Sequence, residues 1–265
     1  MRIILPTFAK LNLTLRVINK RSDGYHNIVS TFLKIPSGDI LLVSESTAGI
    51  DIVNSDTPIK GENIVLKALR AAREDGFKFP YLNVMIHKMI PPGSGLGAGS
   101  GNAAAILLLL GAERVAAKVG ADVPFLCSGM DMSIVTGIGD QVDRTKKDVS
   151  IPHGVIAIPD WQTDTKTAYE ELDEIGFGVD TLLARTEMRD IYYANAGKKV
   201  GMLPNDFTKV LLKQHPKYNE LFSMFEKAGA NAWGITGSGS SAFGVFNTVP
   251  KLFKWPNYVK NVLYF

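Results

Sequence analysis

A glycine-rich loop is the part of this sequence with the clearest chemical meaning. Glycine occupies every second position from 93 to 101, after two prolines and before an apolar segment that starts at Asn102. A ligand can approach the backbone closely where side chains are absent. If a helix follows, the free N–H groups and the positive end of the helix dipole converge on one point, which favours phosphate binding. The sequence therefore predicts an anion-binding loop made of Pro91, Pro92, Gly93, Ser94, Gly95, Leu96, Gly97, Ala98, Gly99, Ser100 and Gly101.

The common phosphate-loop templates fit this loop poorly. No Gly-Lys-Ser/Thr closes the segment, so the Walker pattern is excluded. Gly93, Gly95 and Ala98 match the spacing of a dinucleotide fingerprint, but that motif needs an acidic residue about 20 positions later, at the end of a second strand. Glu113 has this spacing but follows a predicted helix. A plain flexible turn is the alternative, although such a turn rarely needs this many glycines after two prolines.

The segments around the loop predict the elements that position it. Alternation over residues 81–86 predicts a strand that leads into the loop, and residues 102–110 predict an apolar helix after it. Strands and helices are mixed without a regular βαβ period. Further strands are expected at residues 2–5, 11–17, 40–43, 132–135, 155–158 and 242–246, and further helices at 62–74, 115–119 and 217–228.

The length of the chain and one polar stretch predict two domains. A chain of 265 residues can form one large domain or two modest ones, each with its own core. Residues 143–150 are polar and lie between apolar segments, which is typical of a linker or an exposed hairpin. We therefore expect domains at residues 1–148 and 149–265.

Composition and charge exclude several classes of function. The formal charge of +3 comes from 29 basic and 26 acidic residues that are scattered along the chain, so no nucleic-acid footprint is expected. The longest purely apolar run, residues 103–110, is too short to span a membrane, and the N-terminal segment lacks the layout of a secretory signal. The single cysteine, Cys127, lies in an apolar run and is expected to be a buried, inert thiol. We therefore expect a cytoplasmic protein that binds neither nucleic acid nor a membrane.

Three separated motifs resemble those of the GHMP kinases, the superfamily of galactokinase, homoserine kinase, mevalonate kinase and phosphomevalonate kinase. They are residues 9–13 (Ala-Lys-Leu-Asn-Leu), the glycine loop, and residues 236–240 (Thr-Gly-Ser-Gly-Ser). Residues 20–26 and 120–125 are similar to signatures of the branch that phosphorylates 4-diphosphocytidyl-2-C-methyl-D-erythritol. The Asp-Gly-Tyr-His element within residues 20–26 is the specific one. The resemblance is good over residues 1–145 and thin afterwards, apart from the last glycine motif and Asn205-Asp206.

This resemblance implies a fold and an activity. The fold would be the α+β, two-domain GHMP kinase fold, with an N-terminal domain like ribosomal protein S5 and a C-terminal ferredoxin-like α/β sandwich. The reaction would transfer the γ-phosphate of ATP, with Mg²⁺, to a hydroxyl of the methylerythritol moiety. Asp122 would be the base, Lys10 would polarise the attacking oxygen, and Asn12 would hold erythritol hydroxyls. Without the resemblance, Lys10 would be read as a surface lysine and Asp122 as a helix cap.

Three aromatic residues are implied to bind the cytosine of such a substrate. Tyr25 offers a stacking face, and His26 offers a ring edge or backbone groups for hydrogen bonds to the base. Tyr169 matches the position of a second aromatic ring, so that two rings would enclose the base. The alternatives are that Tyr25 covers apolar surface at a hairpin turn and that Tyr169 faces the core from a helix.

The sequence departs from the family pattern at two places near the loop. Gly101 stands where the family usually has a serine, and only 20 positions separate Asn102 from Asp122, fewer than usual. The metal ligands are unassigned. Two other functions therefore stay open, a GHMP kinase for a different small alcohol and a family member that binds nucleotide without catalysis.

Overall fold

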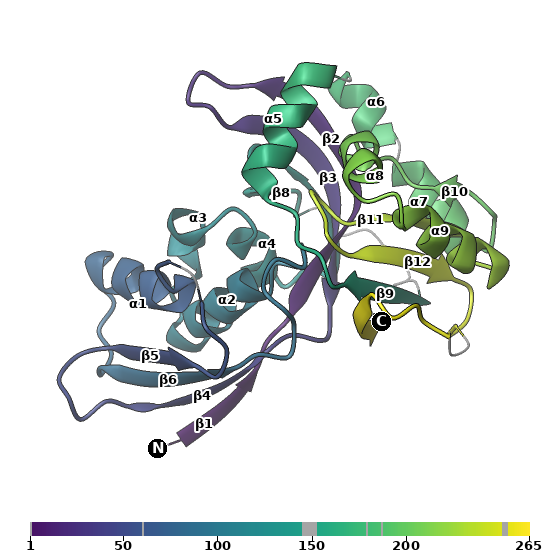
Figure 1. Cartoon of the computed structure of the whole chain (residues 1–265). Helices are drawn as coiled ribbons and strands as arrows, with labels where there is room; N and C mark the ends of the chain where they lie inside the picture. Colours follow the sequence, from purple (N-terminus) through teal and green to yellow (C-terminus); the bar gives the residue numbers. More distant parts are fainter. Residues whose placement is uncertain (1, 60, 145–152, 179, 187, 251–253) are drawn as a thin grey trace.

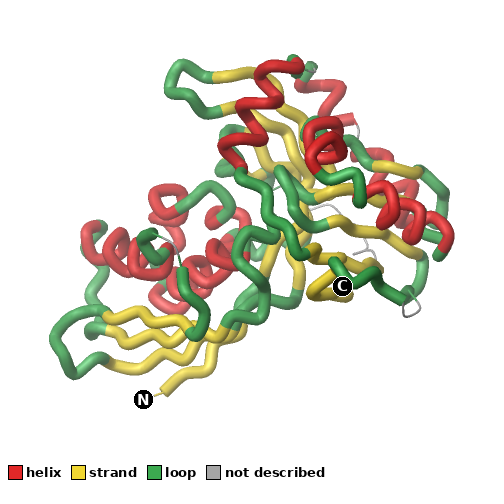
Figure 2. The backbone as a smooth tube through the Cα atoms, viewed as in Figure 1, coloured by secondary structure: helices red, strands yellow, loops and turns green. Residues whose placement is uncertain are grey.

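Three sheets form the framework of the described chain, and helices pack against them (Figures 1 and 2). A computed structural model describes residues 2–59, 61–144, 153–178, 180–186, 188–250 and 254–265. The boundary expected between residues 148 and 149 lies outside these ranges. Among the described residues, no helix has the length and apolar character needed to cross a membrane.

The first sheet carries the strand that leads into the glycine loop. Its strand order is β1 (Arg2–Pro6), β4 (Ile40–Glu45), β6 (Leu82–His87), β5 (Ile52–Ser55). Alternate residues of β6 are buried because one face of the sheet packs against two helices, α1 (Ile64–Glu74) and α2 (Ala98–Leu110). Helix α1 begins where the Asn63 side chain accepts a hydrogen bond from the backbone of Val65.

The second sheet contains a long hairpin that joins the two halves of the molecule. Its order is β2 (Ala9–Lys20), β3 (His26–Ile35), β7 (Met132–Thr136), β8 (Gln141–Val142). Leu11 and Leu13 of β2 pack against strands of the C-terminal half, so this hairpin is covered on both faces. The short helices η1 (Glu113–Val115), α3 (Ala116–Val119) and α4 (Val123–Cys127) share one hydrophobic core with α1, α2 and this sheet.

The third sheet lies in the C-terminal half (Figure 1), and helices pack on both of its faces. Its order is β10 (Gly201–Met202), β11 (Ala232–Ile235), β12 (Ala242–Phe246), β9 (His153–Pro159), β13 (Val259–Tyr264). One of these faces also packs on β2, which brings the second glycine motif next to the first. The helices of this half are α5 (Thr165–Ile175), α6 (Thr181–Thr186), α7 (Met188–Asn195), α8 (Thr208–Gln214) and α9 (Tyr218–Lys227).

The expected strands and helices are confirmed, with one corrected boundary and several omissions. Helix α2 begins at Ala98 rather than at Asn102, so Gly99 and Gly101 are helical. The segment expected as one helix at 115–119 is split between η1 and α3. The sequence predicted no strand or helix at the positions of β3, β5, α4, β8, α5, α6, α7, β10, α8, β11 and β13.

Candidate active site

The glycine loop makes a sharp bend between β6 and α2. Gly93, Gly95 and Gly97 adopt the left-handed backbone region, with φ values of 75°, 78° and 62°. Non-glycine residues rarely adopt this region, which explains why these three positions are glycine. Gly97 is the N-cap of α2 and provides no side-chain cap, so the first-turn N–H groups can bind a ligand. The loop and the first turn of α2 line one wall of a cavity that also reaches Asn63 and Ile86.

The loop is docked against the second glycine motif. A Cβ atom on Gly95 would lie 2.1 Å from the carbonyl oxygen of Gly239. Next to this contact, the carbonyl oxygen of Ser94 accepts hydrogen bonds from the N–H (3.1 Å) and the hydroxyl (2.6 Å) of Ser241. The two motifs, which lie far apart in the sequence, therefore form one surface that tolerates no side chain at Gly95.

The glycine at position 101 has a packing role. A Cβ atom there would lie 1.8 Å from the carbonyl oxygen of Phe8, in the connection between β1 and β2. Gly101 does not line the cavity, whereas Ser100 does. A serine at position 101 would therefore collide with backbone and would not present its hydroxyl to a ligand of this cavity. The absent hydroxyl follows from close packing of α2 on the segment before β2.

A lysine and an aspartate meet beneath the loop. Lys10 Nζ donates to Asn12 Oδ1 at 2.6 Å and lies 3.6 Å from Asp122 Oδ2. The Lys10 residue is only 7% exposed, so it is no surface lysine. Asp122 stands at the N-cap position of α4, but its side chain makes no capping hydrogen bond. Lys10 is therefore not a surface lysine, and the Asp122 side chain does not cap a helix.

Two glycines of the loop, Gly95 and Gly97, line a separate cavity together with the lysine and the aspartate. A Cβ atom on Gly97 would lie 3.0 Å from Asp122 Oδ2 and 3.1 Å from Lys10 Cε, so the loop backbone passes directly over the pair. The cavity, of about 230 Å³, is also lined by Asn12 and Tyr169. A phosphate on the loop and a hydroxyl on Asp122 would meet here. This geometry suits proton removal and in-line transfer of a phosphoryl group.

Three residues with no predicted site role, Ser30, Asn205 and Thr236, hold Asn12 and the second glycine motif. The backbone N–H of Asn12 donates to Thr236 Oγ1 (2.9 Å), and its side-chain N–H donates to Ser30 Oγ (2.9 Å). With Nδ2 bound to Ser30, Oδ1 is turned toward Lys10. Asn205 donates from Nδ2 to the carbonyl oxygens of Ile235 and Gly237, both at 2.8 Å, and so holds the second glycine motif. No sequence signal marks Ser30, because its role depends on pairing between β2 and β3.

The aromatic residues line another cavity, which adjoins the cavity of Lys10 and Asp122. Tyr169 and Ile138 line both. Tyr25 is 61% exposed next to the turn of the β2–β3 hairpin. The His26 ring stacks on Tyr169 at a centroid distance of 4.5 Å and an interplanar angle of 17°. His26 therefore covers one face of the Tyr169 ring in this structure.

An unpredicted aspartate, Asp173, holds His26 in place. Its Oδ1 accepts from His26 Nε2 at 2.7 Å, and its Oδ2 accepts from Lys20 Nζ at 2.5 Å. Burial by itself would raise the pKa of Asp173, but the hydrogen bonds from Lys20 and His26 lower it on balance. Burial also raises the pKa of Tyr169 to about 12, with a smaller contribution from the charge of Asp122. The Tyr169 hydroxyl is therefore neutral near pH 7.

Comparison with known proteins decides the family. Residues 63–130 match the GHMP kinases N terminal domain, and residues 190–252 match the GHMP kinases C terminal domain. A 4-diphosphocytidyl-2-C-methyl-D-erythritol kinase of Porphyromonas gingivalis is 35% identical, over 95% of this chain and 94% of its own. The chain belongs to the GHMP kinase family. A kinase of the same name from Parabacteroides distasonis is 33% identical, over 90% of this chain and 89% of its own.

Solved structures of other GHMP kinases agree with this assignment. The crystal structure of a 4-(cytidine 5'-diphospho)-2C-methyl-D-erythritol kinase matches with a TM-score of 0.70 and 27% identity, over 92% of this chain and 90% of its own. A homoserine kinase from Cytophaga hutchinsonii matches with a TM-score of 0.65 at 18% identity, over 93% of this chain and 85% of its own. The second match shows the fold alone. The α+β GHMP kinase fold expected from the sequence is confirmed.

The single cysteine of this GHMP kinase is half-buried beside α2. Burial, and to a smaller extent the charge of Glu113, raise the pKa of the Cys127 thiol to about 12. Only the thiolate reacts, so a raised pKa leaves less reactive form at neutral pH. We expect a disulfide reagent at about pH 8 to modify Cys127 at least about 100-fold more slowly in the native protein than in urea. Equal rates measured by thiol release would contradict an inert thiol.

Proposed function

We propose that this GHMP kinase transfers the γ-phosphate of ATP to the 2-hydroxyl of 4-diphosphocytidyl-2-C-methyl-D-erythritol, a step of the non-mevalonate route to isoprenoid precursors. The observation that carries the proposal is the position of the Lys10–Asp122 pair. The pair lines a cavity of its own, which shares Gly95 and Gly97 with the cavity of the glycine loop and shares Tyr169 with the cavity of Tyr25 and His26. A molecule with a phosphoryl acceptor at one end and a flat base at the other fits this arrangement. The relatives with this activity in their names match over nearly the whole chain.

The glycine loop and the start of α2 bind the triphosphate in this proposal. The left-handed glycines bring the backbone close to the phosphates, and the N-terminal N–H groups of α2 donate to phosphate oxygens. In the described part of the chain, no three His, Cys, Asp or Glu side chains form a group that could hold a metal ion. Mg²⁺ would accordingly take most of its ligands from the nucleotide and water, and Ser100, which lines the cavity of the loop, could add a hydroxyl oxygen.

The acceptor hydroxyl is activated by Asp122 in this proposal. Asp122 Oδ2 accepts the proton as the substrate oxygen attacks, and the ammonium group of Lys10 stabilises negative charge on that oxygen. Lys10 is held by Asn12 Oδ1, which itself is held by Ser30, so the ammonium group has little freedom to move. A held charge stabilises the transition state without reorganisation during the reaction.

The cytidyl group binds in the cavity of Tyr25 and His26 in this proposal. Tyr25 stacks on the base, and the ordered His26 provides hydrogen bonds to its edge. Asp173 holds the His26 ring through Nε2.

The single cysteine and the absence of a spanning helix among the described residues fit our proposal of a cytoplasmic location.

The decisive experiment follows ADP release from the purified protein with ATP and Mg²⁺. 4-Diphosphocytidyl-2-C-methyl-D-erythritol should produce ADP at a rate that saturates with its concentration. Homoserine and mevalonate are the control acceptors and should give only the background rate. ADP release with a control acceptor alone would replace the proposed substrate by another small alcohol. Binding of ATP with no turnover on any acceptor would leave a nucleotide-binding protein without catalysis.

The exposed ring of Tyr25 provides a test of the cytidyl site. Replacing Tyr25 by Ala should weaken binding of the cytidyl substrate by about 1–3 kcal/mol, because base stacking is lost. This corresponds to a rise in KM of about 5- to 150-fold. The KM for ATP should change little, since Tyr25 does not line the glycine-loop cavity. Tyr25→Phe keeps the ring and should behave like the native enzyme. Tyr81→Ala removes another exposed ring, which lines neither cavity, and serves as a control. An unchanged substrate KM in Tyr25→Ala would show that Tyr25 does not bind the substrate.

A further inference from the structure

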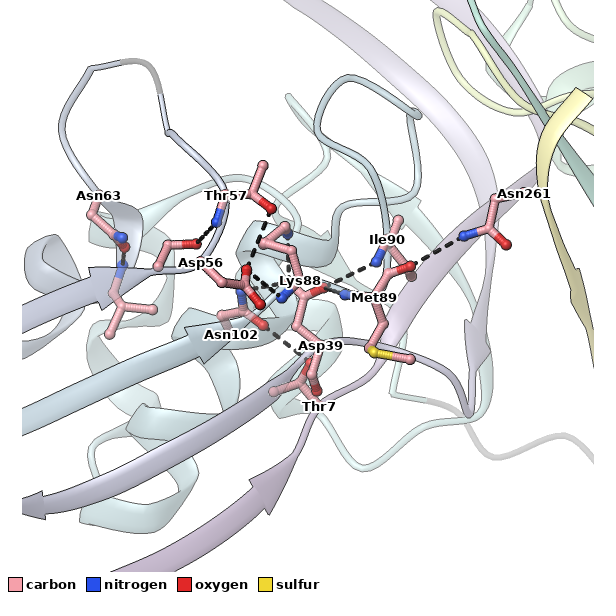
Figure 3. A network of polar contacts seen from close by, with 12 residues as sticks. Thr7, Asp39, Asp56, Thr57, Asn63, Lys88, Met89, Ile90, Asn102 and Asn261 are labelled. Atoms are coloured by element: carbon pink, nitrogen blue, oxygen red, sulfur yellow. Dashed lines mark hydrogen bonds and ion pairs between the residues drawn. The ribbon is translucent and has the colours of Figure 1, made fainter. Parts of the chain in front are cut away.

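A fully buried aspartate lies at the base of the glycine loop (Figure 3). The side chain of Asp39 is 0% exposed, and both of its oxygens are used. Its Oδ1 accepts from the backbone N–H groups of Met89 (2.9 Å) and Ile90 (3.2 Å). Its Oδ2 accepts from Lys88 Nζ (2.5 Å) and Asn102 Nδ2 (2.8 Å). A buried carboxylate is stable only with such partners, so these four donors must stay where they are.

These donors come from the two ends of the loop. Met89 and Ile90 follow β6 and directly precede Pro91, where the loop starts. Asn102 belongs to the second turn of α2, where the loop has ended. One carboxylate therefore connects the segment before the loop to the helix after it. The separation of the two ends determines how widely the loop between them opens.

Thr7 fixes the orientation of the Asn102 amide. Its hydroxyl lies 3.1 Å from Asn102 Oδ1 and 3.0 Å from the backbone oxygen of Asp39, and it can donate to either. With Oδ1 directed at Thr7, the Nδ2 of Asn102 is directed at Asp39. Asn102 and Lys88 also line the cavity of the glycine loop, whereas Thr7 and Asp39 do not. The carboxylate can therefore act on a ligand there only through its neighbours.

We propose that Asp39 is a positioning residue for nucleotide binding, which holds the two ends of the glycine loop at the separation that a triphosphate requires. This inference rests on the proposed function, because it takes ATP as the ligand of the loop. A loop already held in its binding shape loses less conformational freedom when the nucleotide binds. Without the carboxylate, the loop has to be ordered by the nucleotide itself, and the affinity for ATP falls.

Asp51 is a matched control in the same half of the molecule. Its side chain is 10% exposed, it pairs with Arg73 (2.8 Å), and it accepts from the backbone N–H of Leu82 (2.8 Å). Like Asp39 it is a largely buried carboxylate with a cationic partner and a backbone donor next to β6. Unlike Asp39 it has no contact with the loop or its two ends. A loss of stability alone should therefore appear in both variants.

The experiment measures binding of ATP with Mg²⁺ by calorimetry in Asp39→Asn and Asp51→Asn. Asparagine keeps the size of Asp39 but turns an amide N–H₂ toward Lys88 and Asn102, both of which are donors. We expect both variants to unfold at a lower temperature, but only Asp39→Asn to raise the Kd for ATP, by about tenfold or more. The KM for the cytidyl substrate should stay within about twofold in both variants, because its cavity does not contact Asp39.

A second variant decides the matter if Asp39→Asn does not fold. Thr7→Val keeps the volume of Thr7 but removes the hydroxyl that orients Asn102, and it should raise the Kd for ATP by about two- to fivefold. An unchanged Kd for ATP in Asp39→Asn, or in Thr7→Val if the first variant is unfolded, would overturn the inference. Equal effects in Asp39→Asn and Asp51→Asn would also overturn it. If the native chain itself does not bind ATP, the proposed function fails first and the inference fails with it.

Discussion

Asp122→Asn lowers kcat by about 10²–10⁴-fold, the usual contribution of a general base, while the affinity for ATP stays nearly constant. Asparagine has the size of aspartate but cannot accept a proton at the pH of the reaction. Lys10 keeps its hydrogen bond to Asn12 in the variant, so the cavity retains its shape. Turnover is measured by ADP release at saturating substrate, and ATP binding by calorimetry.

Two further measurements show whether the loss belongs to proton removal. Asp131→Asn removes an exposed carboxylate that pairs with Lys34 of β3, and kcat should be unchanged. Asp122→Asn should bind the cytidyl substrate at least as well as the native enzyme, because only the reaction step is affected. If kcat stayed within about threefold of the native value, Asp122 would not be the base, since a general base contributes far more.

Gly95→Ala is expected to lower kcat/KM for ATP by about 100-fold, because it separates the two glycine motifs and so misplaces the groups that must meet in the transition state. The new Cβ atom would lie 2.1 Å from the carbonyl oxygen of Gly239, and backbone cannot rotate away as a flexible side chain can. The left-handed conformation of residue 95, with φ of 78°, adds about 1–2 kcal/mol of strain for alanine. Steady-state kinetics with varied ATP and a thermal unfolding curve measure the two effects.

Gly49→Ala separates backbone strain from the contact between the motifs. Gly49 has a similar φ of 72°, but nothing lies within 4 Å of a Cβ atom there. This variant should lose about 1–2 kcal/mol of stability and no activity. If Gly95→Ala behaved in the same way, the docking of the glycine motifs would have no part in phosphate transfer.

The glycine loop shows which structural features can be predicted from residue types along a short segment. Its bend was predictable, because left-handed backbone depends on residue type alone. Anion binding by the loop stays a prediction. The start of α2 was not predictable, because glycine disfavours helix and residues 98–101 therefore read as loop. The helix begins at Ala98 because close packing of Gly101 against Phe8 outweighs that preference.

Strand β3 shows the limit of hydrophobic periodicity. Strands with one buried face alternate, and β6 was predictable for that reason. Nearly all of β3 is buried on both faces, and it includes the polar residues Ser30 and Thr31 within the core. Its sequence therefore shows neither a period of two nor a continuous apolar run, so no strand was predicted there.

By itself the sequence determined the backbone of the glycine loop, the strand and the helix around it, and the classes of partner that charge and hydropathy exclude. The tertiary structure alone decided which polar side chains meet. Lys10 and Asp122 had structural alternatives until burial and a 3.6 Å separation removed them. No sequence pattern indicated a role for Asp173 or Asp39. The reason is physical, since backbone preferences act between chain neighbours, whereas the chemistry of a carboxylate depends on burial and on donors that distant segments supply.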